Sequence, residues 1–521
     1  MDFIVAKSAK VEYNGLQMTL KGKKWIFRLD SLPEVFVSGK AMASTVSKAV
    51  KAGRLRKIGS RLYTRNMTEA PDAIVKRNWH PLLKSYFPDA LIADRTALEN
   101  HPAPDGSVFI ISSGKRTVEL PGIAFRARKG SPPLKNDLPF LGGLHISSHA
   151  RAWLENMRPT RARAAEVART LSQPELENRL DLLLRQSGEA ALNRLRDEAR
   201  EVSKQLDMAQ EFHELDELIG TFLGTRNAKL ESSVGQARLK GLAYDPDRLD
   251  LFKLLFEELR SRGPITRMAE NMGDSAKTNL AFFEAYFSNY IEGTEFPLDE
   301  AVDIVFKGVI PKERPQDAHD VLETYRVVAD YEQLARTPRR FDDFVALLRE
   351  RHAMVMAMRP DKKPGDFKSV ANRAGNTDFV LPNLVMGTLE KGFEVYRGIE
   401  PPLHRATFMM FLVSEVHPFV DGNGRVARIM MNSELVAAGE QKIIIPTIFR
   451  NNYLVALKAL SQSGKSAPIV QVLDFAQKYT SAIRWGDFNE ARTDLLSTHA
   501  FLDANEADDQ GIRLILPKSV I

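Results

Sequence analysis

The chain has 521 residues, of which 44% are hydrophobic, and a formal net charge of +6 at pH 7. Its length predicts about three to four domains. It contains no cysteine, which excludes a disulfide framework, a thiolate metal site and a cysteine nucleophile. No stretch approaches the roughly 18 apolar residues of a membrane span, and the apolar run at the N-terminus is too short for a signal peptide. We therefore expect a cytoplasmic protein without a membrane partner.

The positive charge is concentrated in residues 1–70, which hold 14 Lys and Arg against 5 Asp and Glu, an excess larger than the net charge of the whole chain. Apolar residues at helical spacing predict a helix over 40–51, and a Gly59-Ser60 turn predicts a β-hairpin after it. This succession resembles a winged helix-turn-helix, which implies DNA as a partner. The alternative is a small basic fold with a solvated charged face. The residues expected to contact DNA are Lys40, Ser44, Ser47, Lys48, Lys51, Arg54, Arg56, Lys57 and Arg61.

Residues 71–150 have the pattern of a mixed α+β region, with a helix over 81–86 and strands over 90–93, 108–112 and 116–120. The strings DALIADRTALEN, GSVFIISS and VELPGIAFRARKG, following the winged-helix pattern, resemble the AbiEi-type family of antitoxins and transcriptional regulators. We expect Asp94 and Arg95 to be structural. Leucines at helical spacing predict that residues 151–240 are helical, as a spacer or as the end of the regulator-like region.

From residue 245 the chain predicts amphipathic helices up to about residue 480. One of them ends in Ser288-Asn289-Tyr290-Ile291-Glu292-Gly293. A glutamate at a helix end can pair with an arginine in a bidentate fork. The alternative is an ordinary helix-terminal Glu-Gly pair.

Residues 363–382 predict a second hairpin, with a turn at Gly375-Asn376.

The most informative stretch is His417–Arg428, HPFVDGNGRVAR, between two apolar segments at helical spacing. Gly422, Asn423 and Gly424 fall at the start of the second helix, where free N–H groups and the helix dipole favour a phosphate. Arg425 and Arg428 can bind further phosphate oxygens. Asp421 suits a Mg²⁺ ion bridging a polyphosphate, and His417 suits a general base.

This stretch resembles the Fic-domain signature H-x-F-x-[D/E]-G-N-G-R-x-x-R at every fixed position. The resemblance implies an enzyme that transfers AMP from ATP to a protein hydroxyl, with His417 as base and Asp421 as the Mg²⁺ ligand. The Ser288–Gly293 string is similar to the family's inhibitory motif, which implies that Ser288, Glu292 and Gly293 act on Arg428. The nucleotide-binding residues implied are Gly422, Asn423, Gly424, Arg425, Arg428, Ala374, Gly375, Asn376, Thr377 and Tyr453. For Tyr453 the alternative is an ordinary buried helix residue.

The predicted fold is therefore a mainly α C-terminal Fic domain with a small β-hairpin flap, behind an α+β N-terminal region that includes a winged helix. The predicted segments are 1–70, 71–150, 151–240, 245–480 and a C-terminal tail, 481–521. The predicted substrates are ATP with Mg²⁺ and a target protein, with the chain itself as a further candidate target and a homo-oligomer left open. The alternative functions are removal of AMP, another Fic-type transfer, or a DNA-binding regulator that senses a nucleotide.

Overall fold

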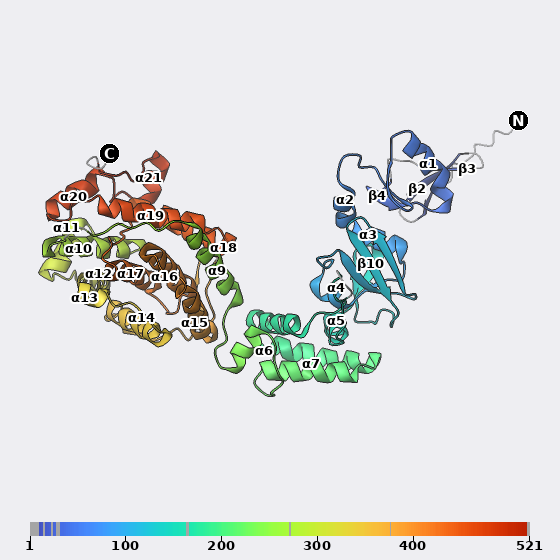
Figure 1. The fold of residues 1–521 in the computed structure, drawn as a ribbon, viewed down its shortest axis with the longest axis horizontal. Helices are drawn as coiled ribbons and strands as arrows, with labels where there is room; N and C mark the ends of the chain where they lie inside the picture. The colour runs from blue at the N-terminus through green and yellow to red at the C-terminus, as the bar shows by residue number, and fades with distance from the viewer. Residues whose placement is uncertain are drawn as a thin grey trace. The chain divides into compact units, whose positions relative to one another are not determined.

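The computed structural model describes residues 10–13, 16–21, 24–27, 32–162, 166–269, 272–375 and 377–517. The chain divides into two compact units, Met1–Gln236 and Ala237–Ile521. Figure 1 gives the element labels used below. Among the described residues, none of the helices combines the length and apolar character that crossing a bilayer requires.

The N-terminal unit begins with two small antiparallel sheets. The first has the order β1-β2-β3, with β1 (Lys10–Tyr13), β2 (Leu16–Lys21) and β3 (Lys24–Phe27). The second has the order β4-β6-β5 and consists of β4 (Val35–Val37), β5 (Arg56–Gly59) and β6 (Leu62–Thr64). The helix α1 (Ala43–Lys51) lies between β4 and β5 in the sequence. The helix predicted over 40–51 is α1, preceded by a 3₁₀ turn over Lys40–Met42.

A mixed six-stranded sheet with the order β11-β12-β7-β8-β10-β9 follows. Its strands are β7 (Leu91–Ile92), β8 (Ser107–Ile111), β9 (Arg116–Leu120), β10 (Ile123–Arg128), β11 (Leu138–Phe140) and β12 (Leu144–Ile146). The helices around it are α2 (Pro71–Arg77), α3 (Trp79–Tyr86), α4 (Asp94–Glu99) and α5 (His149–Asn156). Asp94 is buried, and its carboxylate accepts hydrogen bonds from Arg128 and Arg169, so its contacts are structural.

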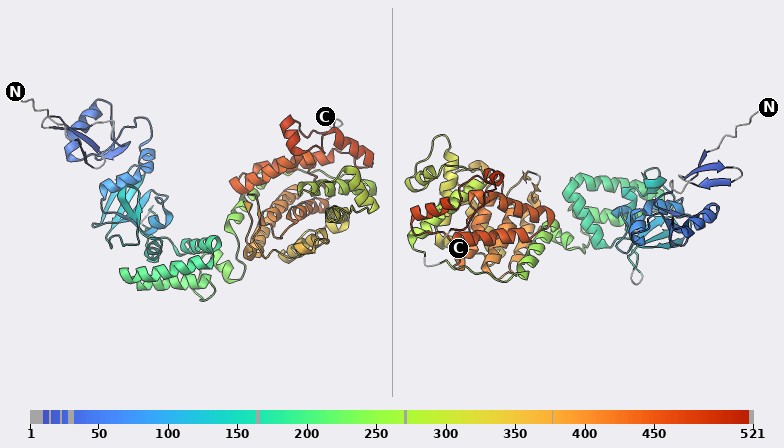
Figure 2. Two further views of the ribbon diagram at one scale, coloured as in Figure 1. Left: turned by 180° about the vertical axis from the view of Figure 1, so that it is seen from behind. Right: turned by 90° about the horizontal axis from the view of Figure 1, so that it is seen from above.

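The last part of this unit is helical. It contains α6 (Gln173–Leu206), interrupted at Gly188, and α7 (Ala209–Phe222), which lies beside α6 (Figure 2). Helix α8 (Ser233–Leu239) spans the boundary between the units. The five-part division of the chain stays a prediction.

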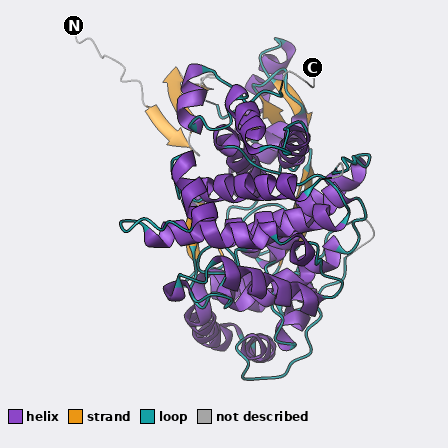
Figure 3. Cartoon of the chain, turned by 90° about the vertical axis from the view of Figure 1, so that its left-hand side faces the viewer, coloured by secondary structure: helices purple, strands orange, loops and turns teal. Residues whose placement is uncertain are grey.

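The C-terminal unit is mainly helical, as predicted (Figure 3). Its helices are α9 (Pro246–Ser261), α10 (Asp274–Ile291), α11 (Leu298–Lys307), α12 (Pro315–Ala329), α13 (Tyr331–Leu334), α14 (Phe341–Val355), α15 (Val385–Tyr396), α16 (Pro402–Val416), α17 (Asn423–Ala437), α18 (Arg450–Ser463), α19 (Ala467–Ser481), α20 (Phe488–Ser497) and α21 (Ala504–Gln510). Between α14 and α15 the chain forms a short β-hairpin, made of β13 (Arg373–Ala374) and β14 (Thr377–Asp378).

Helices α16 and α17 form the centre of this unit (Figure 1). Twelve side chains of α16 are buried, which explains why its sequence is apolar around the whole helix rather than on one face. The segment expected as a tail carries α20 and α21, and Leu495 and Leu514 are buried in the same core cluster as Phe283 of α10.

Candidate active site

The loop between α16 and α17 is bounded by two residues in the left-handed region. His417 ends α16 with φ 52°, and Gly422 begins α17 with φ 73°. Pro418 follows His417 and has no N–H to continue the helix, which favours the sharp stop there. The chain therefore presents the imidazole at one helix end and free N–H groups at the start of the next.

The interior of the loop is fixed by Asn423 and Phe419. The Asn423 side chain accepts a hydrogen bond from the Phe419 N–H (2.8 Å) and donates one to the Phe419 carbonyl (3.0 Å). The Phe419 ring is buried and stacked on His352 of α14, with 3.7 Å between ring centroids. His352 Nδ1 accepts from the Gly365 N–H, so Nε2 carries the proton and donates to the Asp421 carbonyl. Burial lowers the pKa of His352 to about 4, which keeps it neutral in this role.

His417 has the geometry of a neutral base. Its Nδ1 lies 3.2 Å from the Ser414 carbonyl, which can only accept, so Nδ1 carries the proton and Nε2 keeps its lone pair. Burial lowers the pKa of His417 to about 4. The Phe379 ring lies parallel to the imidazole, with 3.6 Å between centroids and 5° between planes.

Arg428 of α17 is bonded to the segment that the sequence singled out near residue 290. Its Nε donates to Ser288 Oγ (3.0 Å), and its Nη2 donates to the Ser288 carbonyl (2.8 Å) and to Glu292 Oε1 (2.7 Å). The pairing with Glu292 is thus a single hydrogen bond and not the bidentate fork that we expected. A Cβ at Gly424 would overlap Glu292 Oε1, so the carboxylate lies against the N-terminal turn of α17. Gly293 follows with φ 89° and ends the helix.

These groups meet in one cavity of about 260 Å³. The predicted site residues that line it are Glu292, Ala374, Thr377, His417, Gly424, Arg428 and Tyr453. Further lining residues that we did not predict are Ile291, Phe379, Ser414, Glu415, Arg450, Leu454, Leu457, Lys458 and Ser461. Most of these come from α18, whose sequence has no motif that distinguishes it from an ordinary amphipathic helix.

Other predicted residues do not line the cavity. Gly422 and Asn423 shape the loop behind it, and Asp421 Oδ1 accepts from the Gly422 N–H (2.7 Å). Arg425 was expected to bind phosphate, but its buried guanidinium lies 3.1 Å from Asp320 of α12. Helix positions three apart differ by about 60° in direction; this difference lets Arg425 reach Asp320 while Arg428 lines the cavity.

The predicted hairpin is β13–β14, with Gly375 in its turn at φ 57°. Ala374 and Thr377 line the cavity, and Asn376 lies outside the described residues. Arg248 of α9 donates to the Asp378 carbonyl (2.5 Å) and is paired with the buried Glu415 of α16. This arginine was not predicted, because its partners are distant in the sequence.

Tyr453 is buried, and its hydroxyl donates to Met410 Sδ (3.2 Å). It is therefore both a buried helix residue and part of the cavity wall.

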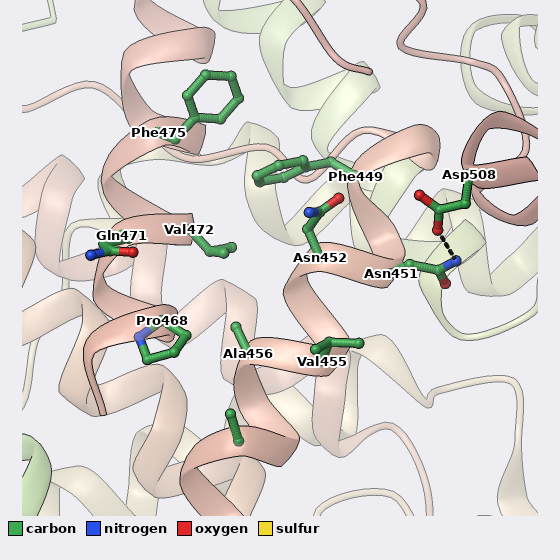
Figure 4. A pocket seen from close by; sticks show the side chains of 11 residues that line it. Phe449, Asn451, Asn452, Val455, Ala456, Pro468, Gln471, Val472, Phe475 and Asp508 are labelled. Carbon is green, nitrogen blue, oxygen red and sulfur yellow. Dashed lines mark hydrogen bonds between the residues drawn. The ribbon is translucent and has the colours of Figure 1, made fainter. Parts of the chain in front are cut away.

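A second cavity, of about 430 Å³, lies between α18 and α19 (Figure 4). It contains none of the predicted site residues. At its edge Asn451 donates to Asp508 Oδ2 (3.0 Å), which connects the start of α18 to α21.

The residues expected to contact DNA lie on α1, on β5 and in the turns next to them. Lys40, Ser44, Ser47, Lys48, Lys51, Arg54, Lys57 and Arg61 are exposed, and Arg56 is half-buried. Two of them are bonded to the backbone, Arg61 to the Ser38 carbonyl (2.8 Å) and Arg56 to the Glu69 carbonyl (2.9 Å). A role in DNA binding stays a prediction.

The Fic/DOC family model matches residues 342–435. The chain is 26% identical over 267 residues to the protein adenylyltransferase Fic of Drosophila yakuba, an alignment that covers 50% of each protein. It is also 26% identical over 266 residues to the protein of the same name of Drosophila melanogaster, covering 50% of this chain and 51% of that protein. The chain thus spans about half the length of the curated relatives it matches.

Among solved structures, a Fic domain containing signaling protein from Bacteroides thetaiotaomicron is 18% identical, with a TM-score of 0.36, and covers 47% of this chain and 97% of that one. Fic-1 from C. elegans is 19% identical, with a TM-score of 0.34, and covers 59% of this chain and 94% of that one. The family match includes α16, the loop, and most of α17. The C-terminal unit of this chain therefore contains a Fic domain.

Proposed function

We propose that this chain is a protein adenylyltransferase, which moves AMP from ATP to a Ser, Thr or Tyr hydroxyl of a protein and is held in check by Glu292. One observation carries the proposal: a single cavity gathers a neutral imidazole, the N-terminal turn of a helix at Gly424, and the guanidinium of Arg428. The relatives named protein adenylyltransferase support the same activity.

In the proposed reaction, His417 Nε2 takes the proton of the target hydroxyl as its oxygen attacks the α-phosphorus of ATP. The new bond joins this oxygen to the α-phosphorus, the bond from the α-phosphorus to the bridging oxygen breaks, and pyrophosphate leaves. The N–H groups at the start of α17 and the Arg428 guanidinium stabilise the phosphate charge. The chain's part is mainly positioning and charge neutralisation, as is usual for such transfers.

Asp421, which lies in the loop and does not line the cavity, is the carboxylate that would hold Mg²⁺. Its Oδ2 makes no hydrogen bond to the described part of the chain, and Mg²⁺ commonly takes one or two carboxylates together with substrate phosphates. No group of three or more His, Asp or Glu side chains in the described residues is placed to hold a metal. The ion would neutralise phosphate charge.

In the proposed inhibition, Glu292 competes with phosphate for Arg428. The carboxylate lies against the turn at Gly424 and accepts a hydrogen bond from Arg428 Nη2. Its negative charge therefore lies where a phosphate would otherwise bind. ATP bound beside it would lack one of its cationic contacts.

The test is incubation with ATP labelled in the α- or the γ-phosphate, together with cell lysate. We expect label on protein from the α-position alone in Glu292→Gly, and none in Glu292→Gly/His417→Ala. Label from the γ-position would instead indicate phosphate transfer. Loss of AMP from a pre-labelled protein would indicate the reverse reaction, and the absence of any transfer together with sequence-specific DNA binding would favour a regulator. Label on this chain itself would identify it as a target.

A further inference from the structure

We infer that Phe379 and Lys368 are positioning residues for His417: the phenyl ring holds the imidazole plane, and Lys368, on the same segment, places a buried positive charge beside this stack. The inference rests on the proposed function of His417 as a base. It starts from the parallel stack of Phe379 on His417, with centroids 3.6 Å apart. The two rings come from segments that are separate in the sequence, the residue after β14 and the end of α16.

Lys368 is a buried ammonium group that the proposed reaction does not use. Its side chain is 4% exposed, and its Nζ lies 6.0 Å from the centroid of the Phe379 ring. It donates to Asn372 Oδ1 (2.6 Å), and it has no ion pair with any carboxylate in the described residues. Burying an ammonium group without a counter-charge is unfavourable, and burial lowers the pKa of Lys368 to about 8. Such groups are concentrated at functional sites.

The same segment is fixed to the loop that carries His417. The Lys368 N–H donates to the Pro418 carbonyl (2.8 Å), and Asn372 Nδ2 donates to the Phe419 carbonyl (2.8 Å). The Phe379 N–H donates to the Asn372 carbonyl (3.3 Å), so both positioning residues are joined through Asn372. The stack is therefore part of one bonded assembly and not a chance contact of a mobile ring.

The stack has two consequences for the imidazole. A flat ring in van der Waals contact restricts rotation of the imidazole, which keeps Nδ1 at the Ser414 carbonyl and leaves Nε2 as the acceptor. The charge of Lys368 opposes a second positive charge on His417, in the same direction as burial. Glu292 and Asp421 act in the opposite direction, towards the imidazolium.

Four further charged groups line the same cavity. Arg428 is paired with Glu292, and Glu415, two residues before His417, is paired with Arg248. Arg450 is half-buried and donates to the Ile291 carbonyl (3.2 Å), and Lys458 is exposed, so solvent screens the charge of both. Lys368 is buried and has no counter-charge in the described residues, so we assign to it the least screened charge that opposes protonation of His417 from outside its own helix.

The test compares Phe379→Leu, Phe379→Trp, Lys368→Met and Lys368→Arg in the Glu292→Gly background. We expect Phe379→Leu to lower kcat by about 10- to 100-fold with ATP affinity nearly unchanged, because small displacements of a base have effects of this size. Phe379→Trp, which keeps a flat ring, should recover most of the rate. Lys368→Met should move the acid limb of kcat/KM upwards by about one pH unit, as expected for a unit charge within 10 Å, and Lys368→Arg should restore it.

Two matched controls lie elsewhere in the same unit. Phe306→Leu removes a half-exposed aromatic ring that is stacked on Phe282, and Lys478→Met removes an exposed ammonium group in the last turn of α19. Neither should change kcat or the pH profile. A loss of rate in Phe306→Leu equal to that in Phe379→Leu would mean that unspecific loosening explains both.

The roles of Phe379 and Lys368 can also be tested independently of the proposed function, by a measurement that requires no enzymatic activity. In protein with isotope-labelled histidine, the imidazole signal of His417 is assigned by its loss in His417→Ala. We expect its titration to shift upwards in Lys368→Met and its tautomer populations to change in Phe379→Leu. Unchanged signals in both variants would overturn the inference, even if AMP transfer is found. Absence of transfer in every variant, with these shifts present, would overturn the proposed function alone.

Discussion

Glu292 gives the sharpest test of how this site is controlled. Its carboxylate accepts one charge-assisted hydrogen bond from Arg428 Nη2, at 2.7 Å, and its side chain is 30% exposed. Such a bond contributes about 1.5–3 kcal/mol, and because solvent screens part of it we take the lower end, about 1.5 kcal/mol. Since 1.4 kcal/mol corresponds to a factor of ten, freeing Arg428 for phosphate should raise the rate by about tenfold.

Two variants separate charge from occupied space. Glu292→Gln keeps the size of the side chain and removes its charge, so we expect about a tenfold rise in AMP incorporation from α-labelled ATP. Glu292→Gly also empties the space beside Gly424, so its rise should be larger. The matched control is Glu295→Gln, which removes one exposed carboxylate three residues further on and should leave the rate unchanged.

Inhibition by Glu292 is refuted if both Glu292 variants bind ATP as wild type does and yet incorporate no more AMP. A rise of the same size in Glu295→Gln would also refute it, because the effect would then be one of general charge.

Three further predictions concern the loop, the inhibitory helix and pH. Asn423→Ala leaves the buried Phe419 N–H without its side-chain partner and removes one of the two side-chain donors to the Phe419 carbonyl, which still accepts from Asn372. It should therefore lower the free energy of unfolding by about 1–3 kcal/mol, and an unchanged denaturant midpoint would contradict this. Tyr290→Phe removes the hydrogen bond from the Tyr290 hydroxyl to Asp503 Oδ2 (3.0 Å), close to Glu292 in the sequence. The end of α10 should then be less well fixed, and AMP incorporation should rise a few-fold. Equal incorporation by the variant and the wild type would refute this prediction. Burial lowers the pKa of His417 to about 4, and only the neutral imidazole accepts a proton. The kcat/KM of Glu292→Gly should therefore be constant from pH 8 to about pH 5.5 and decrease at lower pH. A decrease that begins near pH 6.5 would show a histidine with an ordinary pKa.

The parts of the fold that the sequence could predict are those set by local patterns. The helix–loop–helix around His417 is set by an apolar run, a proline and two glycines within a short stretch. Strand β9, Arg116–Leu120, has the predicted bounds because turns mark both of its ends. The mainly α character of the C-terminal unit is confirmed. The three-stranded sheet β1–β3 was not predicted, although β2 alternates apolar and polar residues, because its strands have only four to six residues each.

The candidate site could be predicted only where its chemistry lies in one stretch of sequence. The pairing of Glu292 with Arg428 was found through a motif, but the direction of Arg425 depends on Asp320, which belongs to another helix. Lys368 gave no signal, since a lysine between Phe367 and Ser369 in a polar segment is ordinarily exposed. Its burial results from the tertiary contact of that segment with the loop.

The two left-handed residues that bound the loop have different tolerance to exchange. A Cβ at Gly422 would lie 2.8 Å from Met356 Sδ, and a left-handed backbone adds about 1–2 kcal/mol of strain for a residue with a side chain. His417 already accepts that strain, so an inactivating exchange there perturbs both chemistry and chain direction. Asparagine tolerates this conformation better than alanine does. Comparing His417→Asn with His417→Ala would thus separate the missing proton acceptor from a distorted corner of the backbone.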